Sequence, residues 1–147
     1  ERADELGGAL GPYALQAAIA ACHARAATPE ATDWPRLAAL YDALAQLAPS
    51  PIVELNRAVA VGMAFGPAAG LEVVERLTTE PSLRGYHLLP AVRGDLLARL
   101  GRHEEAAEAF RDAAVLTRNS REQALLTGRA EASARAGTAG DAGTIKG

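Results

Sequence analysis

The sequence predicts an all-helical protein, and two properties of the chain lead to this fold class. Hydrophobic residues make up 49% of the 147 residues but aromatic residues only 4%, so the core must consist mainly of Ala, Leu and Val. Small and aliphatic side chains of this kind favour closely packed helices over sheets. Helix breakers also divide the chain into segments of about 13 to 17 residues, which is the length of ordinary globular helices.

The first helices begin at clear sequence signals. Gly11-Pro12 begins the first helix, because proline is tolerated at the first helical position, where its missing N–H costs nothing. Asp33 is expected to cap the second helix, and Ser50-Pro51 to begin the third. Seven helices are expected in all, over residues 12–27, 34–48, 51–65, 67–79, 86–100, 103–118 and 120–135.

The later helices carry signals of their own. Pro90 must lie near the first turn of the fifth helix, because deeper inside it would remove a backbone hydrogen bond. Glu104 and Glu105 lie near the positive end of the sixth helix dipole. Asn119-Ser120 is expected to cap the seventh helix, and Ser120 and Gln123 have the spacing of a capping box.

These helices predict one domain over residues 12–135, since a chain of this length can enclose a single apolar core. Residues 1–11 are interpreted as the remnant of a preceding helix or linker, which suggests a fragment of a longer protein. The tail 136–147 is rich in Gly, Ala and Thr and is expected to be disordered.

An internal period relates the even-numbered helices of this series. Leu37, Leu71 and Ala106 are separated by 34 and 35 residues, and two further sets follow the same spacing: Tyr41, Glu75 and Phe110, and Leu44, Thr78 and Ala113. A period near 34 is typical of tetratricopeptide repeats, in which each unit is a pair of helices. The third unit also places small residues at Gly94, Ala106 and Ala113 around the aromatic Phe110, as that motif requires.

We therefore expect a tetratricopeptide-like, right-handed helical repeat array with three helix pairs and a C-terminal capping helix. The alternative is an irregular helical bundle, which would have similar helices but no superhelical groove.

Charge and composition exclude several classes of function. Fifteen Lys and Arg against eighteen Asp and Glu give a net charge of −3, which is not the balance of a nucleic-acid-binding domain. The apolar stretch 59–71 is interrupted by glycine and proline and is shorter than the roughly 20 residues of a membrane span. A single cysteine and the lack of a signal-peptide pattern favour the reducing cytoplasm.

No catalytic, cofactor or metal site is expected. His23, His87 and His103 fall on three different helices and lack a nearby carboxylate or cysteine pattern. Cys22 follows the spacing of a small buried residue, because its neighbour His23 points about 100° away around the helix.

Two other groups of residues allow a functional and a structural interpretation. Gly62, Gly66 and Gly70 are similar to a phosphate loop, but no strand precedes them, and helix contact with a turn explains them better. Trp34 and Tyr41 could stack on a ligand, but a tryptophan just after an N-cap usually anchors the helix entry.

Beyond the repeat, six strings point to one family. They are GPYALQAAIAA (11–21), TDW (32–34), SPIVELNRAVAV (50–61), YHLL (86–89), RGDLL (93–97) and LGR (100–102). Over about residues 11–130 the chain resembles the C-terminal extension of certain bacterial extracytoplasmic-function sigma factors. In that family two N-terminal helical regions bind promoter DNA and dock on RNA polymerase, and the extension regulates or supports sigma activity.

The resemblance implies a role in transcription initiation. The partners would be the N-terminal regions of the sigma factor, RNA polymerase, or both, and DNA would be contacted only through the missing N-terminal part. No membrane partner is expected.

Five polar residues are the candidate partner-binding site. The repeat pattern places Asn56 and Asp95 on the concave groove, with Arg57 and Arg93 at its border and Gln16 joining from the first helix. These side chains could hydrogen-bond a partner peptide or a helix of the sigma factor. The alternative is that Arg57, Arg93 and Asp95 satisfy one another as a structural network between repeats.

The leading functional hypothesis is a non-catalytic protein-interaction and regulatory domain that acts on sigma core regions or on polymerase. The second hypothesis is a small-molecule-sensing helical repeat domain. An apolar pocket with few converging polar groups would favour the sensor, and a long open polar groove would favour the interaction domain.

Overall fold

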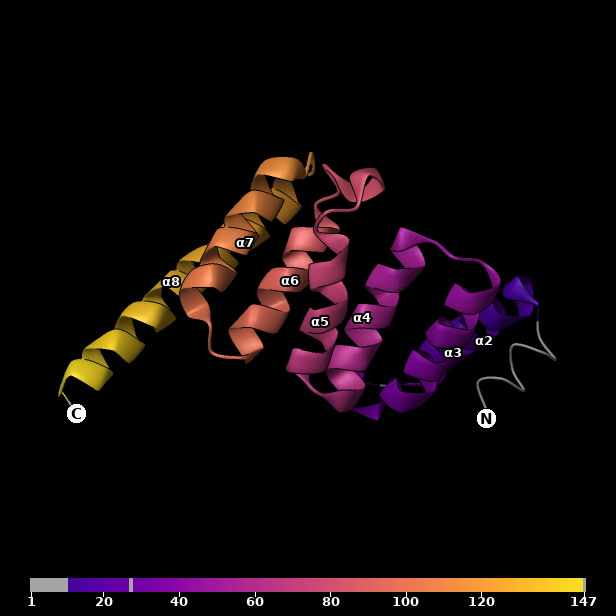
Figure 1. Cartoon of the computed structure of the whole chain (residues 1–147). Helices are drawn as coiled ribbons and strands as arrows, with labels where there is room; N and C mark the ends of the chain where they lie inside the picture. Colours follow the sequence, from indigo (N-terminus) through magenta and orange to yellow (C-terminus); the bar gives the residue numbers. More distant parts are fainter. Residues whose placement is uncertain (1–10, 27, 147) are drawn as a thin grey trace. The chain divides into compact units, whose positions relative to one another are not determined.

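The computed structural model describes residues 11–26 and 28–146, and within these ranges it contains seven α-helices, two short 3-10 turns and no strand (Figure 1). The predicted all-α class is therefore confirmed. The helices are α2 (Pro12–Arg25), α3 (Trp34–Leu47), α4 (Pro51–Phe65), α5 (Pro67–Leu77), α6 (Leu88–Arg99), α7 (His103–Leu116) and α8 (Ser120–Lys146). Most of the predicted N-terminal remnant, residues 1–11, lies outside the described residues.

The chain forms two compact units, where the sequence predicted one domain. The first unit extends to Val73 and the second begins at Val74. In the first unit, α3 packs against both α2 and α4. In the second, α7 packs against both α6 and α8. No helix among the described residues is both long and apolar enough to cross a membrane.

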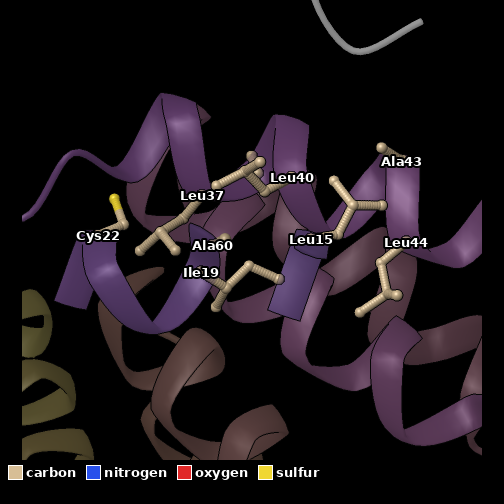
Figure 2. Close-up of a cluster of buried hydrophobic side chains, with 9 residues drawn as sticks. Leu15, Ile19, Cys22, Leu37, Leu40, Ala43, Leu44 and Ala60 are labelled. Carbon is tan, nitrogen blue, oxygen red and sulfur yellow. The ribbon is translucent and has the colours of Figure 1, made fainter. Parts of the chain in front are cut away.

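The core of the first unit consists of aliphatic side chains from α2, α3 and α4, as Figure 2 shows. Its members are Leu15, Ile19, Cys22, Leu37, Ala38, Leu40, Ala43, Leu44 and Ala60. The predicted burial of Cys22 is confirmed, and its thiol donates to the carbonyl oxygen of Asp33 at 3.8 Å. Trp34 and Tyr41 pack against this core, which agrees with the anchor interpretation of Trp34.

The predicted start signals of the first unit are confirmed. Asp33 accepts a hydrogen bond from the backbone N–H of Arg36 at 3.2 Å, which satisfies a donor that the helix itself leaves unpaired. Ser50 caps α4 in the same way through the N–H of Ile52. At the other end of α4, Gly66 has a φ of 109°, a conformation that favours glycine, so the helix ends there.

A close contact between two glycines joins α4 to α5. A Cβ atom added to Gly70 would lie 2.8 Å from the Cα of Gly62 and 2.8 Å from the carbonyl oxygen of Ala58. The two helices can therefore approach this closely only because Gly70 has no side chain. The prediction that Gly62, Gly66 and Gly70 serve helix contact and a turn, rather than phosphate binding, agrees with this geometry.

In the second unit, Phe110 of α7 fills the space that Gly94 leaves on α6. The ring of Phe110 is 1% exposed, and a Cβ atom on Gly94 would lie 2.9 Å from it. Ala106 and Ala113 are fully buried on the same helix. Small residues around one aromatic ring thus let α6 and α7 pack closely, as the third repeat unit predicted.

The start of α8 lies at the predicted Asn119-Ser120 pair, but the predicted capping box does not form. Asn119 is the cap, because its side-chain oxygen accepts from the N–H of Glu122 at 2.9 Å. Gln123 does not close a capping box, and its amide instead donates to the carbonyl oxygen of Ala114 at 3.1 Å. The helix itself begins at Ser120, as predicted.

The end of α8 differs from the predicted end at residue 135, because the helix continues to Lys146. Of the tail 136–147, which was expected to be disordered, residue 147 lies outside the described residues. Leu126, Ala130 and Ser133 are buried along its length. A Cβ atom on Gly137 would lie 3.4 Å from His103, so α8 follows α7 back to the first residue of α7.

Candidate partner-binding surfaces

The predicted site residues of the first unit lie on two helices. Gln16 on α2 and Asn56 on α4 are both exposed. Arg57 is partly buried and makes a two-point contact with Glu54, in which Nε donates at 2.8 Å and Nη2 at 3.2 Å. This hydrogen bond raises the pKa of the Arg57 guanidinium above its ordinary value.

In the second unit, Arg93 and Asp95 join different helices. Arg93 of α6 donates through Nε to Glu75 of α5 at 2.7 Å. The carboxylate of Asp95 accepts from Arg99 at 3.1 Å and from Arg129 of α8 at 2.7 Å. Asp95 thus links α6 to α8.

Arg129 has a second contact, since its guanidinium carbon lies 4.4 Å from the centre of the Phe110 ring. This is a cation–π geometry, in which the positive charge faces the negative face of the ring.

The alternative prediction, a network in which Arg57, Arg93 and Asp95 pair with one another, is not what the side chains form. Among the described residues, each of the three pairs with a partner outside this set. Asp95 and Arg93 are nevertheless engaged within the fold, whereas Asn56 and Gln16 remain exposed. Of the five predicted residues, Gln16 and Asn56 are therefore the better candidates for contact with a partner.

One face of α4 surrounds Asn56 with apolar side chains. Ile52, Asn56, Val59 and Met63 follow the spacing of a single helix face, and all but the half-buried Val59 are exposed. The face combines an aliphatic surface with one amide that can both donate and accept.

Replacing Asp95 and replacing Asn56 are expected to change stability by different amounts. Asp95→Ala removes two partly exposed ion pairs and is expected to lower the free energy of unfolding by about 1 kcal/mol. Asn56→Ala removes an exposed side chain and should change it by less than about 0.5 kcal/mol. Urea denaturation followed by circular dichroism measures both values. Equal losses for the two variants would contradict the assignment of Asp95 to a helix-linking role.

A groove in the second unit was not predicted from the sequence. It consists of two adjoining cavities of about 470 Å³ and 370 Å³, which share Thr78, Leu89, Pro90 and Asp112. We call it the α5–α7 groove, because it lies between the ends of these helices and the start of α6. The larger cavity is also lined by Thr79, Glu80, Leu83, Arg84, Gly85, Tyr86, Val115 and Leu116, and the smaller one by Glu75, Arg93 and Ala109.

The connection between α5 and α6 forms one wall of this groove and is held by hydrogen bonds. Glu80 accepts from both the backbone N–H and the hydroxyl of Ser82, at 3.0 Å and 2.9 Å, which lowers the pKa of the Glu80 carboxyl. Leu83 is buried as an anchor, and its carbonyl oxygen accepts from the N–H of Tyr86 at 3.0 Å. Gly85 allows the turn with a φ of 85°.

The histidines show no grouping typical of a metal site. Among the described residues, no cluster of three or more His, Cys, Asp and Glu side chains has a metal-binding arrangement. His87 Nε2 lies 3.1 Å from Glu122 Oε1, a contact that carries a full ion pair only when the imidazole is protonated. The same Glu122 oxygen accepts from the hydroxyl of Thr117 at 2.7 Å, which is the main cause of the lowered pKa of Glu122.

Comparison with known proteins shows a similar sequence. An uncharacterized protein of Rhizobium meliloti (strain 1021) is 52% identical over 116 residues, which cover 79% of this chain and 27% of the relative. The chain thus spans about a quarter of the length of the curated relative that it matches, and nearly three quarters of the relative lie outside the match. No protein-family model and no solved structure matches the chain.

Proposed function

We propose that the chain is a non-catalytic protein-interaction domain at the C-terminal end of an extracytoplasmic-function sigma factor. The observation that carries this proposal is the set of six strings between residues 11 and 102, which together resemble that family's C-terminal extension. The domain would support or regulate transcription initiation by contacting sigma core regions or RNA polymerase.

The packing of the second unit supports a tetratricopeptide-like repeat as the scaffold. Gly94 and Phe110 interlock at the crossing of α6 and α7, and Gly101 turns the chain between these helices with a φ of 80°. The Gly62 and Gly70 contact brings α4 and α5 together in a comparable way. Close helix pairs with small residues at their crossings are what a repeat array needs to expose a continuous binding surface.

The size of the relative supports the wider context. Most of its length lies outside the matched segment, which leaves room for two N-terminal promoter-binding regions. In this proposal DNA is contacted only by those regions, since a net charge of −3 disfavours direct binding by the domain itself. Cytoplasmic location follows from the same role.

The proposal is tested by transcription in vitro with the full-length protein, with and without residues 12–146. Removal of the domain is expected to lower transcription from the cognate promoter several-fold, while the N-terminal regions still bind promoter DNA. Asn56→Ala should lower transcription without changing the melting temperature, because the amide is exposed on the apolar face of α4.

Gln46→Ala is the matched control, since Gln46 is an exposed amide on α3 outside that face. Unchanged transcription after removal of the domain would refute the proposed function. Unchanged transcription with Asn56→Ala alone would refute only the assignment of Asn56.

A small-molecule sensor is the second candidate function. The larger cavity of the α5–α7 groove, at about 470 Å³, is within the range of small-molecule sites. However, it joins a second cavity along the helix ends, which favours an elongated occupant.

A further inference from the structure

We infer that the α5–α7 groove binds a short protein segment that presents an aliphatic side chain beside a lysine or arginine. This inference rests on the proposed function as an interaction domain. It adds the place where a partner docks and the chemistry that the groove recognises in that partner.

The shape of the groove suits a polypeptide segment. Its two cavities share Thr78, Leu89, Pro90 and Asp112, so they form one elongated hollow rather than two separate sites. Successive side chains of a peptide could occupy the two cavities, while the peptide backbone stays near the surface.

The larger cavity is adapted to an aliphatic side chain. Leu83 and Leu89 are buried at its base. Val115 and Leu116, at the end of α7, line it while remaining 80% and 40% exposed. Exposed aliphatic side chains beside a buried apolar base are typical of an interaction site, because docking removes them from water.

The charged residues that line the groove favour a lysine or arginine in the partner, next to its aliphatic side chain. Glu75 is paired with Arg93, and Glu80 is engaged by Ser82. Asp112 lines both cavities, and no described side chain pairs with it.

The helix ends add to this negative charge. Both α5 and α7 end at the groove, and the carboxyl end of a helix carries partial negative charge. At the start of α6 the N–H groups of Leu89 and Ala91 already donate to the carbonyl oxygens of Tyr86 and His87, so these two donors are not free to bind an anion.

The same charges orient the occupant. Arg84 lines only the larger cavity, whereas the charged lining of the smaller cavity is Asp112 and the Glu75–Arg93 pair. A cation is therefore best placed at Asp112 on the side of the smaller cavity, with the aliphatic side chain in the larger one. Hydrogen bonds already order the 78–87 connection, which forms one wall of the groove. Less conformational entropy is therefore lost when a partner binds.

The experiment is fluorescence anisotropy of the 147-residue chain with two labelled eight-residue peptides, one of leucine and lysine and one of leucine and glutamate. We expect the lysine peptide to bind and the glutamate peptide not to bind. Asp112→Asn should weaken binding by roughly tenfold, which is the effect of losing one favourable charge contact. Val115→Lys should weaken it at least as much, and because Val115 is 80% exposed the substitution should leave the fold intact.

Glu108→Gln is the matched control, because it removes the same charge from α7 one turn away, outside the groove lining. Equal effects of Asp112→Asn and Glu108→Gln, or equal binding of the two peptides, would overturn the inference. So would binding of leucine amide as tight as that of the lysine peptide, since the groove would then be a small-molecule site.

Transcription by the full-length protein separates the two proposals. If removal of the domain lowers transcription but Asp112→Asn and Val115→Lys do not, the groove inference fails and the proposed function stands. If the lysine peptide binds through Asp112 but removal of the domain has no effect, the groove stands and the sigma-factor role fails.

Discussion

Replacing Phe110 by alanine is expected to lower the free energy of unfolding by about 3–5 kcal/mol, the range for large aromatic side chains removed from a core. Phe110 is 1% exposed and fills the space beside Gly94, so its removal leaves a cavity as well as unburied apolar surface. The contact with Arg129 is lost in addition. Urea denaturation followed by circular dichroism measures the change.

Phe65→Ala is the control for Phe110→Ala, because it makes the same chemical change at a side chain that is 65% exposed. A change below about 1 kcal/mol is expected there, as for other exposed positions. Comparable losses for the two variants would show that Phe110 is not the packing centre of the second unit.

Gly70→Ala is expected to destabilise the chain by about 1–3 kcal/mol, although alanine is the better helix former. The new Cβ atom would lie 2.8 Å from two backbone atoms of α4, and backbone cannot move aside as a flexible side chain can. Helices α4 and α5 would have to separate locally, with a loss of packing. Thermal and urea unfolding both measure the effect.

Gly128→Ala provides the opposite case within the same chain. Gly128 lies inside α8, and a Cβ atom there would meet nothing within 4 Å. This variant is expected to gain about 0.5–1 kcal/mol from helix propensity alone. If Gly70→Ala were stabilising to the same degree, the close approach of α4 and α5 would not exist in solution.

The helices could be predicted from the sequence because their ends are determined by local chemistry. Asp33, Ser50 and Gly66 form hydrogen bonds with backbone groups no more than four residues away. Both partners of each bond therefore lie within one short stretch of sequence. At α8 the predicted capping box between Ser120 and Gln123 does not form, since the adjacent Asn119 is also a suitable cap and accepts the hydrogen bond instead. The packing of α8 along α7, which brings Gly137 close to His103, could not be predicted from neighbouring residues in the sequence.

The candidate surfaces were harder to predict, because they depend on distant residues. Arg93 and Asp95 were singled out as polar residues within an apolar helix, but their partners Glu75 and Arg129 lie 18 and 34 residues away. The α5–α7 groove depends on where the 78–87 connection is placed against the end of α7. The exposed Val115 is the one local signal that could have suggested it.

Arg129 serves two partners at once, the carboxylate of Asp95 and the ring of Phe110. Substitutions at these three positions are consequently not independent, because loss of the arginine would release a charge on α6 and uncover a ring on α7 together. Natural sequences with this helix packing are expected to change the three residues as a set. Residues 95, 110 and 129 would then covary across three helices, even though they lie far apart along the chain.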